Sequence, residues 1–217
     1  MRPFFPLAAA ISCICLGSTT IHGASDDPAT AKTLPLAVVL VAYDTFGVRS
    51  AELGAARAAV EAILRLASIQ AEWHTCPTTD VLADGADPVC TAGLAKRGVA
   101  IRIVAATPAV PAASLGSSLV ERERGGVLAT VFADRVHRLA GLAGVEPGML
   151  LGRVIAHEVG HLLIRSPAHT QTGLMRARWT VGELRRDLPA DWTWSRQDVA
   201  EIVRGKTTAA TATTQSP

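Results

Sequence analysis

The pattern of apolar and polar positions divides most of the chain into short strands and amphipathic helices. Residues 36–42 form a continuous apolar run of β-branched character, which predicts a buried strand, whereas residues 99–104 alternate as a half-buried strand does. Apolar residues between positions 53 and 66 recur at helical spacing, so we expect a helix over residues 50–68 with Ser50 as its cap. The same patterns predict three further strands, at residues 71–75, 115–120 and 127–132.

The second half of the chain contains three predicted helices. Asp134 is a candidate cap for the first, and Pro147 suits the first turn of the second, which apolar residues surround and should bury. Ser195 and Asp198 belong to a capping sequence for the third helix. Residues 206–217 are rich in Thr and Ala and are expected to form a disordered tail. A chain of 217 residues is long enough for one domain with a sizeable core.

The helix that starts near Pro147 carries His157, Glu158 and His161. Histidines at this four-residue spacing lie on one face of a helix, so both can bind a single metal ion. Glu158 can reach a water molecule on that ion but is poorly aimed as a ligand. Zinc lowers the pKa of such a water to about 7, and a neighbouring carboxylate can then accept its proton as general base. The alternative interpretation is an ordinary helix that happens to carry two histidines.

A third ligand is expected just after this helix, because a catalytic zinc ion usually has three protein ligands and one open position. Pro167 disfavours the helical conformation at Ser166, so the chain should turn there. His169 follows the turn and is the nearest available donor. We therefore predict that His157, His161 and His169 bind the metal.

Other zinc peptidases take a later acidic residue as the third ligand. Glu183 and Asp187 are the candidates for that arrangement here. Two arginines lie between them, and the segment has the composition of a solvated, charge-paired stretch.

These residues resemble the metzincin clan of zinc endopeptidases, whose signature is H-E-x-x-H-x-x-G-x-x-H followed by a methionine-containing turn. The first half of the signature matches, including Gly160, and Met175 in Gly-Leu-Met resembles the methionine of the Met-turn. The signature would place its glycine at Ile164 and its third histidine at Pro167, whereas the histidine here comes two residues later, at His169. The resemblance covers residues 157–175 in motif and residues 36–205 in layout.

The resemblance implies an α+β fold with a mixed, twisted β-sheet, two packed helices that include the zinc-binding helix, and a small C-terminal subdomain with one helix. It also implies that substrate lies extended beside an edge strand, for which residues 116–120 are our candidate. The family often has a tyrosine soon after the Met-turn that stabilises the oxyanion, but Tyr43 lies far away in this sequence. Arg176 and Trp179 follow Met175 and are candidates for shaping the pocket, for surface charge or for core packing.

The charge and the cysteine content of the chain indicate which cellular compartment and which binding partners it has. The formal net charge is only +2 and the basic residues do not cluster, so nothing indicates a nucleic-acid partner. Cys76 and Cys90 are an even pair that is predicted to form a disulfide in an oxidising compartment. The alternative, a second metal site with His74, would have three ligands and no recognised spacing.

The N-terminal residues 1–24 have the pattern of an export signal. Arg2 is followed by an apolar run over residues 4–17, which is short for a membrane span, and small residues near Ala24 offer a cleavage point. Residues 25–35 have the composition of a linker. A lipid anchor at Cys13 and a buried N-terminal strand or helix are the alternatives, although residues 10–13 match a lipoprotein processing site poorly.

The combined prediction is a secreted or periplasmic zinc endopeptidase, monomeric, with one catalytic Zn²⁺ and a protein or peptide substrate. Two alternatives remain open from the sequence. One is an inactive zinc-bound relative that acts as an extracytoplasmic binding module. The other is an exported α/β protein without metal, in which this helix serves packing alone.

Overall fold

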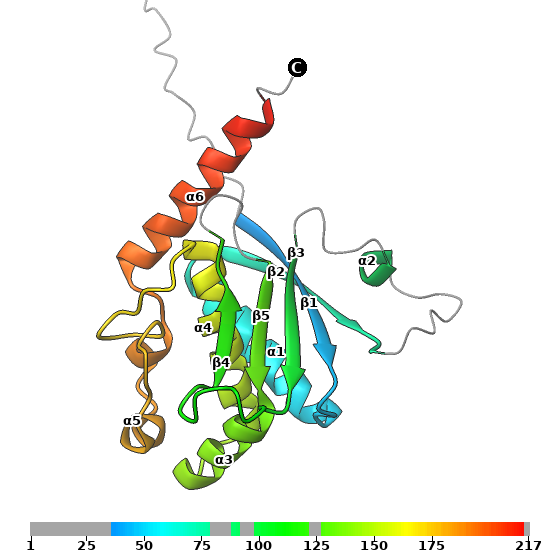
Figure 1. The fold of residues 1–217 in the computed structure, drawn as a ribbon. Helices are drawn as coiled ribbons and strands as arrows, with labels where there is room; N and C mark the ends of the chain where they lie inside the picture. The colour runs from blue at the N-terminus through cyan, green and yellow to red at the C-terminus, as the bar shows by residue number, and fades with distance from the viewer. Residues whose placement is uncertain (1–35, 79–87, 92–97, 122–126, 215–217) are drawn as a thin grey trace, which may run out of the picture. The chain divides into compact units, whose positions relative to one another are not determined.

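A five-stranded mixed sheet forms the centre of the described structure (Figure 1). The computed structural model describes residues 36–78, 88–91, 98–121 and 127–214. Strands follow one another across the sheet in the order β2-β1-β3-β5-β4, and all neighbours are parallel except β4, which is antiparallel to β5. The strands are β1 (Leu36–Asp44), β2 (Ile69–Cys76), β3 (Gly98–Val104), β4 (Gly116–Leu119) and β5 (Leu128–Phe132).

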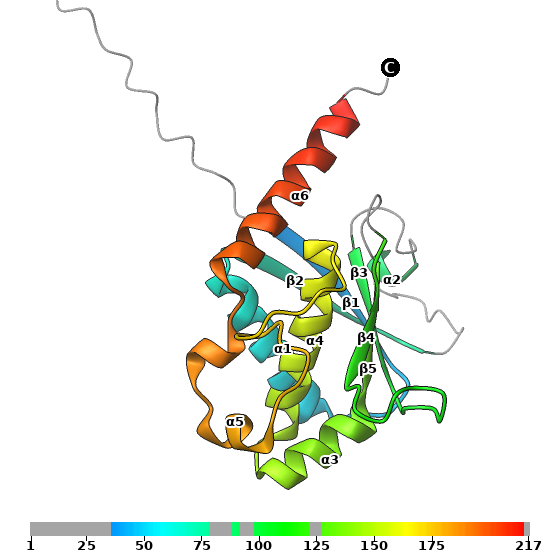
Figure 2. The ribbon, with the colours of Figure 1, turned by 60° about the vertical axis from the view of Figure 1, so that its left-hand side comes forward.

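Two long helices pack on the same face of the sheet and against each other (Figure 2). They are α1 (Ser50–Leu66), which connects β1 to β2, and α4 (Pro147–Ile164). The buried residues of β1, β3 and β5 join those of the two helices in one apolar core, so α4 has its face toward the sheet inside that core. The predicted fold class, an α+β arrangement with a mixed sheet and two packed helices, is confirmed.

The remaining helices lie around this centre. They are the short α2 (Pro88–Thr91), α3 (Ala133–Ala143) directly after β5, α5 (Val181–Arg186), the 3₁₀ helix η1 (Pro189–Trp192) and the C-terminal α6 (Arg196–Thr214). None of the helices among the described residues is both long and apolar enough to cross a membrane.

Several local predictions need correction. Ser50 is the first residue of α1 and makes no capping bond; Asp44 instead accepts hydrogen bonds from the backbone N–H groups of Phe46, Gly47 and Val48 before the helix. The Asp134 side chain does not cap α3, because it accepts a hydrogen bond from the backbone N–H of Ala106 at 2.8 Å. In each case a carboxylate accepts hydrogen bonds from the backbone of a loop and does not cap the nearest helix.

The C-terminal part also contains more structure than expected. The expected single helix is preceded by α5, which begins with a capping box between Thr180 and Glu183, and by η1. Ser195 and Asp198 do cap α6, but the helical backbone continues to Thr214, past Gly205, where a disordered tail was expected to begin. Ala is the strongest helix former, and no proline interrupts the segment before Pro217.

The predicted disulfide joins the end of β2 to α2. Cys76 and Cys90 are bonded, with their Cα atoms 5.6 Å apart. Because both sulfur atoms are in the bond, neither is available to the second metal site that the sequence left open with His74. The predicted export signal, Cys13 and the linker at residues 25–35 lie outside the described residues.

The depth of α4 in the core depends on two glycines that face α1. A Cβ atom on Gly148 would lie 2.5 Å from the carbonyl oxygen of Glu52, and one on Gly152 would lie 2.4 Å from that of Ala56. Both distances are below van der Waals contact, so the backbones of α1 and α4 approach closely only because these positions have no side chain.

We predict that Gly152→Ala lowers the free energy of unfolding by about 1–3 kcal/mol, because the added methyl group must separate two packed helices. Gly54→Ala is the matched control, since a Cβ atom there meets nothing within 4 Å. Because position 54 lies within α1, the Gly54→Ala substitution should raise the free energy of unfolding by about 0.5–1 kcal/mol through its higher helix propensity. Urea denaturation measures both, and a change of the same sign for the two variants would contradict the packing argument.

Candidate metal centre and active site

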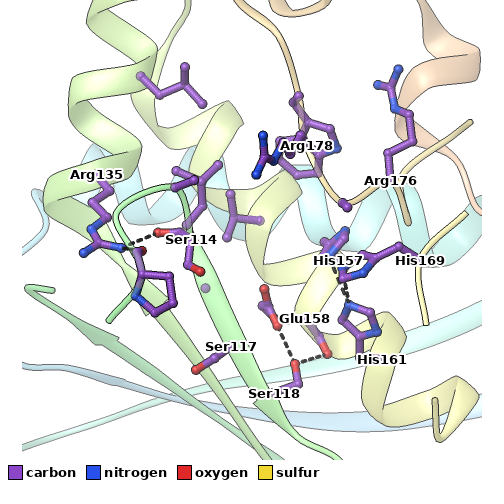
Figure 3. A pocket seen from close by; sticks show the side chains of 18 of the residues that line it. Ser114, Ser117, Ser118, Arg135, His157, Glu158, His161, His169, Arg176 and Arg178 are labelled. Carbon is purple, nitrogen blue, oxygen red and sulfur yellow. Dashed lines mark hydrogen bonds between the residues drawn. The ribbon is translucent and has the colours of Figure 1, made fainter. Parts of the chain in front are cut away.

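Three histidines bring their Nε2 atoms together at one end of α4 (Figure 3). His157 and His161 lie on one face of the helix, both buried, with their Nε2 atoms 3.1 Å apart. The exposed His169 completes the group, with its Nε2 atom 3.2 Å from that of His161. The structure thus brings together the three residues that the sequence predicts as ligands.

His169 reaches this position because the chain reverses after α4. The helix ends at Ile164, and Arg165 adopts a left-handed conformation with φ of 59°. The backbone N–H of Ser166 then bonds to the carbonyl oxygen of His161 at 3.2 Å, and that of Thr170 bonds to Met175 at 2.9 Å. The turn predicted around Ser166 is present, and Arg165 makes its first bend.

Backbone carbonyl groups determine which nitrogen of each buried ring carries the proton. The Nδ1–H of His157 donates to the carbonyl oxygen of Leu174, and the Nδ1–H of His161 donates to that of Ser166, both at 2.8 Å. A carbonyl oxygen only accepts hydrogen bonds, so the proton of each neutral imidazole lies on Nδ1. The Nε2 atoms that face each other therefore present unshared electron pairs.

This arrangement fits a metal ion. Lone pairs that face each other at such distances repel, unless a cation lies between them. Around a tetrahedral ion with nitrogen ligands at about 2.0–2.1 Å, the nitrogen atoms lie about 3.3 Å from one another. The Nε2 separations of 3.1 and 3.2 Å are close to this value. Carbonyl partners on the opposite ring nitrogens are also the usual way in which proteins orient histidine ligands.

Burial keeps these imidazoles in the neutral form that binds metals. Loss of solvation lowers the pKa of His157 to about 4, against an opposing effect of its bond to Leu174. Burial likewise lowers the pKa of His161 and of His169. None of the three needs to lose a proton near neutral pH before it can act as a ligand.

Glu158 lies beside the histidines and faces strand β4. Its side chain is buried, which raises its pKa to about 7, while a hydrogen bond from the Ser118 hydroxyl acts in the opposite direction. The Ser118 Oγ atom lies 2.5 Å from Oε2 of Glu158 and 2.8 Å from its backbone carbonyl oxygen. A Cβ atom on Gly116 would lie 2.6 Å from Oε1, so the strand approaches the carboxylate this closely because position 116 is glycine.

Met175 is almost fully buried and packs against α4 at Gly160. A Cβ atom on Gly160 would meet its Sδ atom at 2.6 Å and Nε1 of Trp194 at 2.8 Å. Met175 and Trp194 can pack this closely against α4 because position 160 is glycine. The Leu174 carbonyl that orients His157 belongs to the same segment as Met175, so packing under the helix and ring orientation are linked.

The two acidic residues considered as alternative metal ligands form ion pairs with arginines instead. Glu183 caps α5 and pairs with Arg176 at 2.5 Å, and Asp187 pairs with the buried Arg153 at 2.5 Å. Among the described residues, the group able to hold a metal consists of the three histidines. An acidic third ligand is not supported.

A cavity of about 670 Å³ opens from the histidines along β4 toward α3. Arg176 and Trp179 both line it, and Trp179 packs edge-on against the ring of His157 with centroids 5.7 Å apart. Tyr43 lines a different cavity, so it is not at this site. Ser118 was not singled out in the sequence, because its contact with Glu158 joins residues 40 positions apart.

Comparison with known proteins gives support at the level of the fold. No model of a known protein family matches the chain, and no match was found among curated proteins. Among solved structures, an archaemetzincin from Methanopyrus kandleri is 15% identical over 82% of this chain and 99% of its own, with a TM-score of 0.49. Metalloproteinase-II from Bacteroides fragilis is 13% identical over 81% of this chain, with a TM-score of 0.50, and the match spans 54% of its length. At such identities the similarity to the metalloproteinase concerns the fold alone.

We expect the purified chain to take up one Zn²⁺ ion per molecule. Replacement of His157, His161 or His169 by Ala should weaken zinc affinity at least about tenfold, since each substitution removes one of three ligands. Glu183→Gln is the control, and it should leave zinc affinity unchanged. Isothermal titration calorimetry of metal-free protein measures stoichiometry and affinity. If Glu183→Gln weakened binding while His169→Ala did not, the third ligand would be misassigned.

Proposed function

We propose that the chain is a zinc-dependent endopeptidase of the metzincin type. The observation that carries this proposal is the convergence of the Nε2 atoms of three histidines beside a buried carboxylate, at the mouth of a cavity along a sheet edge. Such a set of groups suits hydrolysis of a polar bond by a metal-activated water. The fold shared with the metalloproteinase is consistent with this chemistry.

His157, His161 and His169 would hold the ion and leave one position open. A zinc ion bound there would polarise a substrate carbonyl and bring the pKa of a water molecule near 7. Glu158 would accept the proton of that water and deliver it to the leaving amine. The same carboxyl group would thus act as base in the first step and as acid in the second. Met175 would support the site from below without binding the metal, as a Met-turn residue does.

Strand β4 would position the peptide. It is one of the two edge strands of the described sheet and pairs only with β5, so its other side can accept an extended chain. Gly116 and Ser118 on this strand also line the cavity and approach Glu158. A substrate added to this edge would therefore pass directly beside the proposed general base.

We further propose that the protein acts as a monomer outside the cytoplasm, either secreted or periplasmic. The bond between Cys76 and Cys90 supports the proposed compartment, because disulfides persist mainly in oxidising compartments. The leader-like composition of residues 1–24 supports it independently.

The Glu158→Gln variant tests the role of the carboxylate. It should abolish cleavage of a diverse peptide library, with a loss of at least about a thousandfold, while zinc is still bound, because Gln keeps the shape but cannot accept the proton. Glu61→Gln, at a half-buried position on α1 that does not line the cavity, is the control and should keep full activity. Zinc binding without cleavage by the unaltered chain would instead favour the inactive binding module. A chelator should stop cleavage and added zinc should restore it.

Ser118→Ala tests how Glu158 is positioned. Loss of the hydroxyl removes a hydrogen bond to the carboxylate, so kcat should fall about tenfold with little change in KM. Ser50→Ala, an exposed serine at the start of α1, is the control and should not alter kcat. An effect of Ser118→Ala on KM alone would mean that this serine serves substrate binding instead.

A further inference from the structure

The cavity beside the histidines is strongly cationic, although the chain is nearly neutral. Its lining includes four arginines, Arg135, Arg138, Arg176 and Arg178, and one carboxylate, Glu158. The formal net charge of the whole chain is +2. Positive charge is therefore concentrated where a substrate would lie.

One of the four arginines is neutralised by neighbouring acids. Nη1 of Arg176 lies 2.5 Å from Glu183 and 3.4 Å from Asp191. Its guanidinium points away from the histidines in Figure 3, so its charge is directed into the protein rather than toward the cavity. Arg176 therefore contributes little to recognition of a charged ligand.

The other three arginines have no carboxylate partner in the part of the chain that the structure describes. Arg135 donates to the backbone carbonyl oxygens of Val110, Pro111 and Ser114, which fixes its side chain but leaves its charge uncompensated. Arg138 and Arg178 are exposed and extend from the cavity wall. A ligand carboxylate would be their first ionic partner.

The uncompensated arginines come from two different elements. Arg135 and Arg138 share one face of α3 with Leu139 and Leu142, because these positions follow three- and four-residue spacing. Arg178 comes from the segment after Met175. Between these walls lie apolar groups of α3 and Val154 of α4. The cavity thus combines an apolar surface with positive charge from two directions.

We propose that this cavity selects peptides with an acidic side chain, Asp or Glu, within a few residues of the cleaved bond. This proposal rests on the proposed peptidase function and specifies its substrate class. The apolar surface accommodates the methylene groups of such a side chain, and Arg138 and Arg178 are free to bind its carboxylate. Arginine is well suited to this role, since its planar group binds a carboxylate through two parallel hydrogen bonds.

A set of matched peptides tests the proposal. Fluorogenic peptides of one sequence carry Glu, Gln or Lys at each of three positions on either side of the cleaved bond, all with an amidated C-terminus. We expect Glu to exceed Gln in kcat/KM by about tenfold or more at one of these positions, and Lys to be the poorest. The preference should weaken as salt concentration rises, because exposed charges are screened.

Arginine variants test which residues bind the negatively charged side chain of the substrate. Arg138→Gln and Arg178→Gln should each reduce the ratio of Glu to Gln cleavage, mainly through KM, while cleavage of the Gln peptide is retained. Arg196→Gln on α6, an exposed arginine that does not line the cavity, is the control and should keep the full ratio. Loss of all cleavage in the two cavity variants would point to misfolding, which circular dichroism and zinc content would reveal. In that case the proposal is tested by calorimetry, which compares the affinities of zinc-loaded Glu158→Gln protein for the Glu and Gln peptides.

Further measurements separate failure of this proposal from failure of the peptidase function. Equal cleavage of Glu and Gln peptides would overturn the charge preference and leave the peptidase intact. A preference for a Gln peptide with a free C-terminal carboxylate, without a preference for internal Glu, would overturn it in favour of terminal recognition. If no peptide is cleaved, calorimetry with zinc-loaded Glu158→Gln protein still compares the affinities for Glu and Gln peptides. Equal affinities there would overturn the proposal as well.

Discussion

The hydrogen bonds from His157 and His161 to backbone carbonyl groups govern the chemistry of the site. Each bond holds a proton on Nδ1 and so turns an unprotonated Nε2 atom toward the other two histidines. The accepting carbonyl groups, at Leu174 and Ser166, belong to the segment that follows α4. The helix alone can place the two rings on one face, but only this returning segment fixes their tautomers and adds His169.

The position of α4 depends in turn on contacts with the rest of the fold. Gly148 and Gly152 allow the helix to approach α1, and Gly160 allows Met175 and Trp194 to pack beneath it. On the opposite side, Gly116 brings the edge strand β4 against Glu158. At each of these four glycines a Cβ atom would clash with a neighbouring group, so a helix former at Gly148, Gly152 or Gly160 would improve local propensity and displace the helix.

The sequence predicts the parts of the site that depend on local spacing. The four-residue spacing of His157 and His161 places both on one face of a helix in any fold. Pro167 ends the helical conformation, so the position of His169 just after a turn could also be predicted. Long-range contacts could not be predicted in the same way. Glu183 and Asp187 are eliminated as ligands by arginines that the fold brings to them, and Ser118 meets Glu158 across 40 positions. For the same reason the strands and main helices were predicted, whereas α5 and the role of Asp134 were not.

Burial explains why arginines of one chain can differ so much in function. Arg153 and Arg176 are buried, and a buried guanidinium group requires an acidic partner because water no longer solvates it. An exposed arginine has no such requirement, since solvent stabilises its charge. Arg138 and Arg178 can therefore lack a partner in the folded chain without loss of stability. The amino-acid composition and the net charge count buried and exposed arginines alike, so neither distinguishes the two groups. The fold separates them, and Arg138 and Arg178, which lack a carboxylate partner among the described residues, line the cavity beside the three histidines.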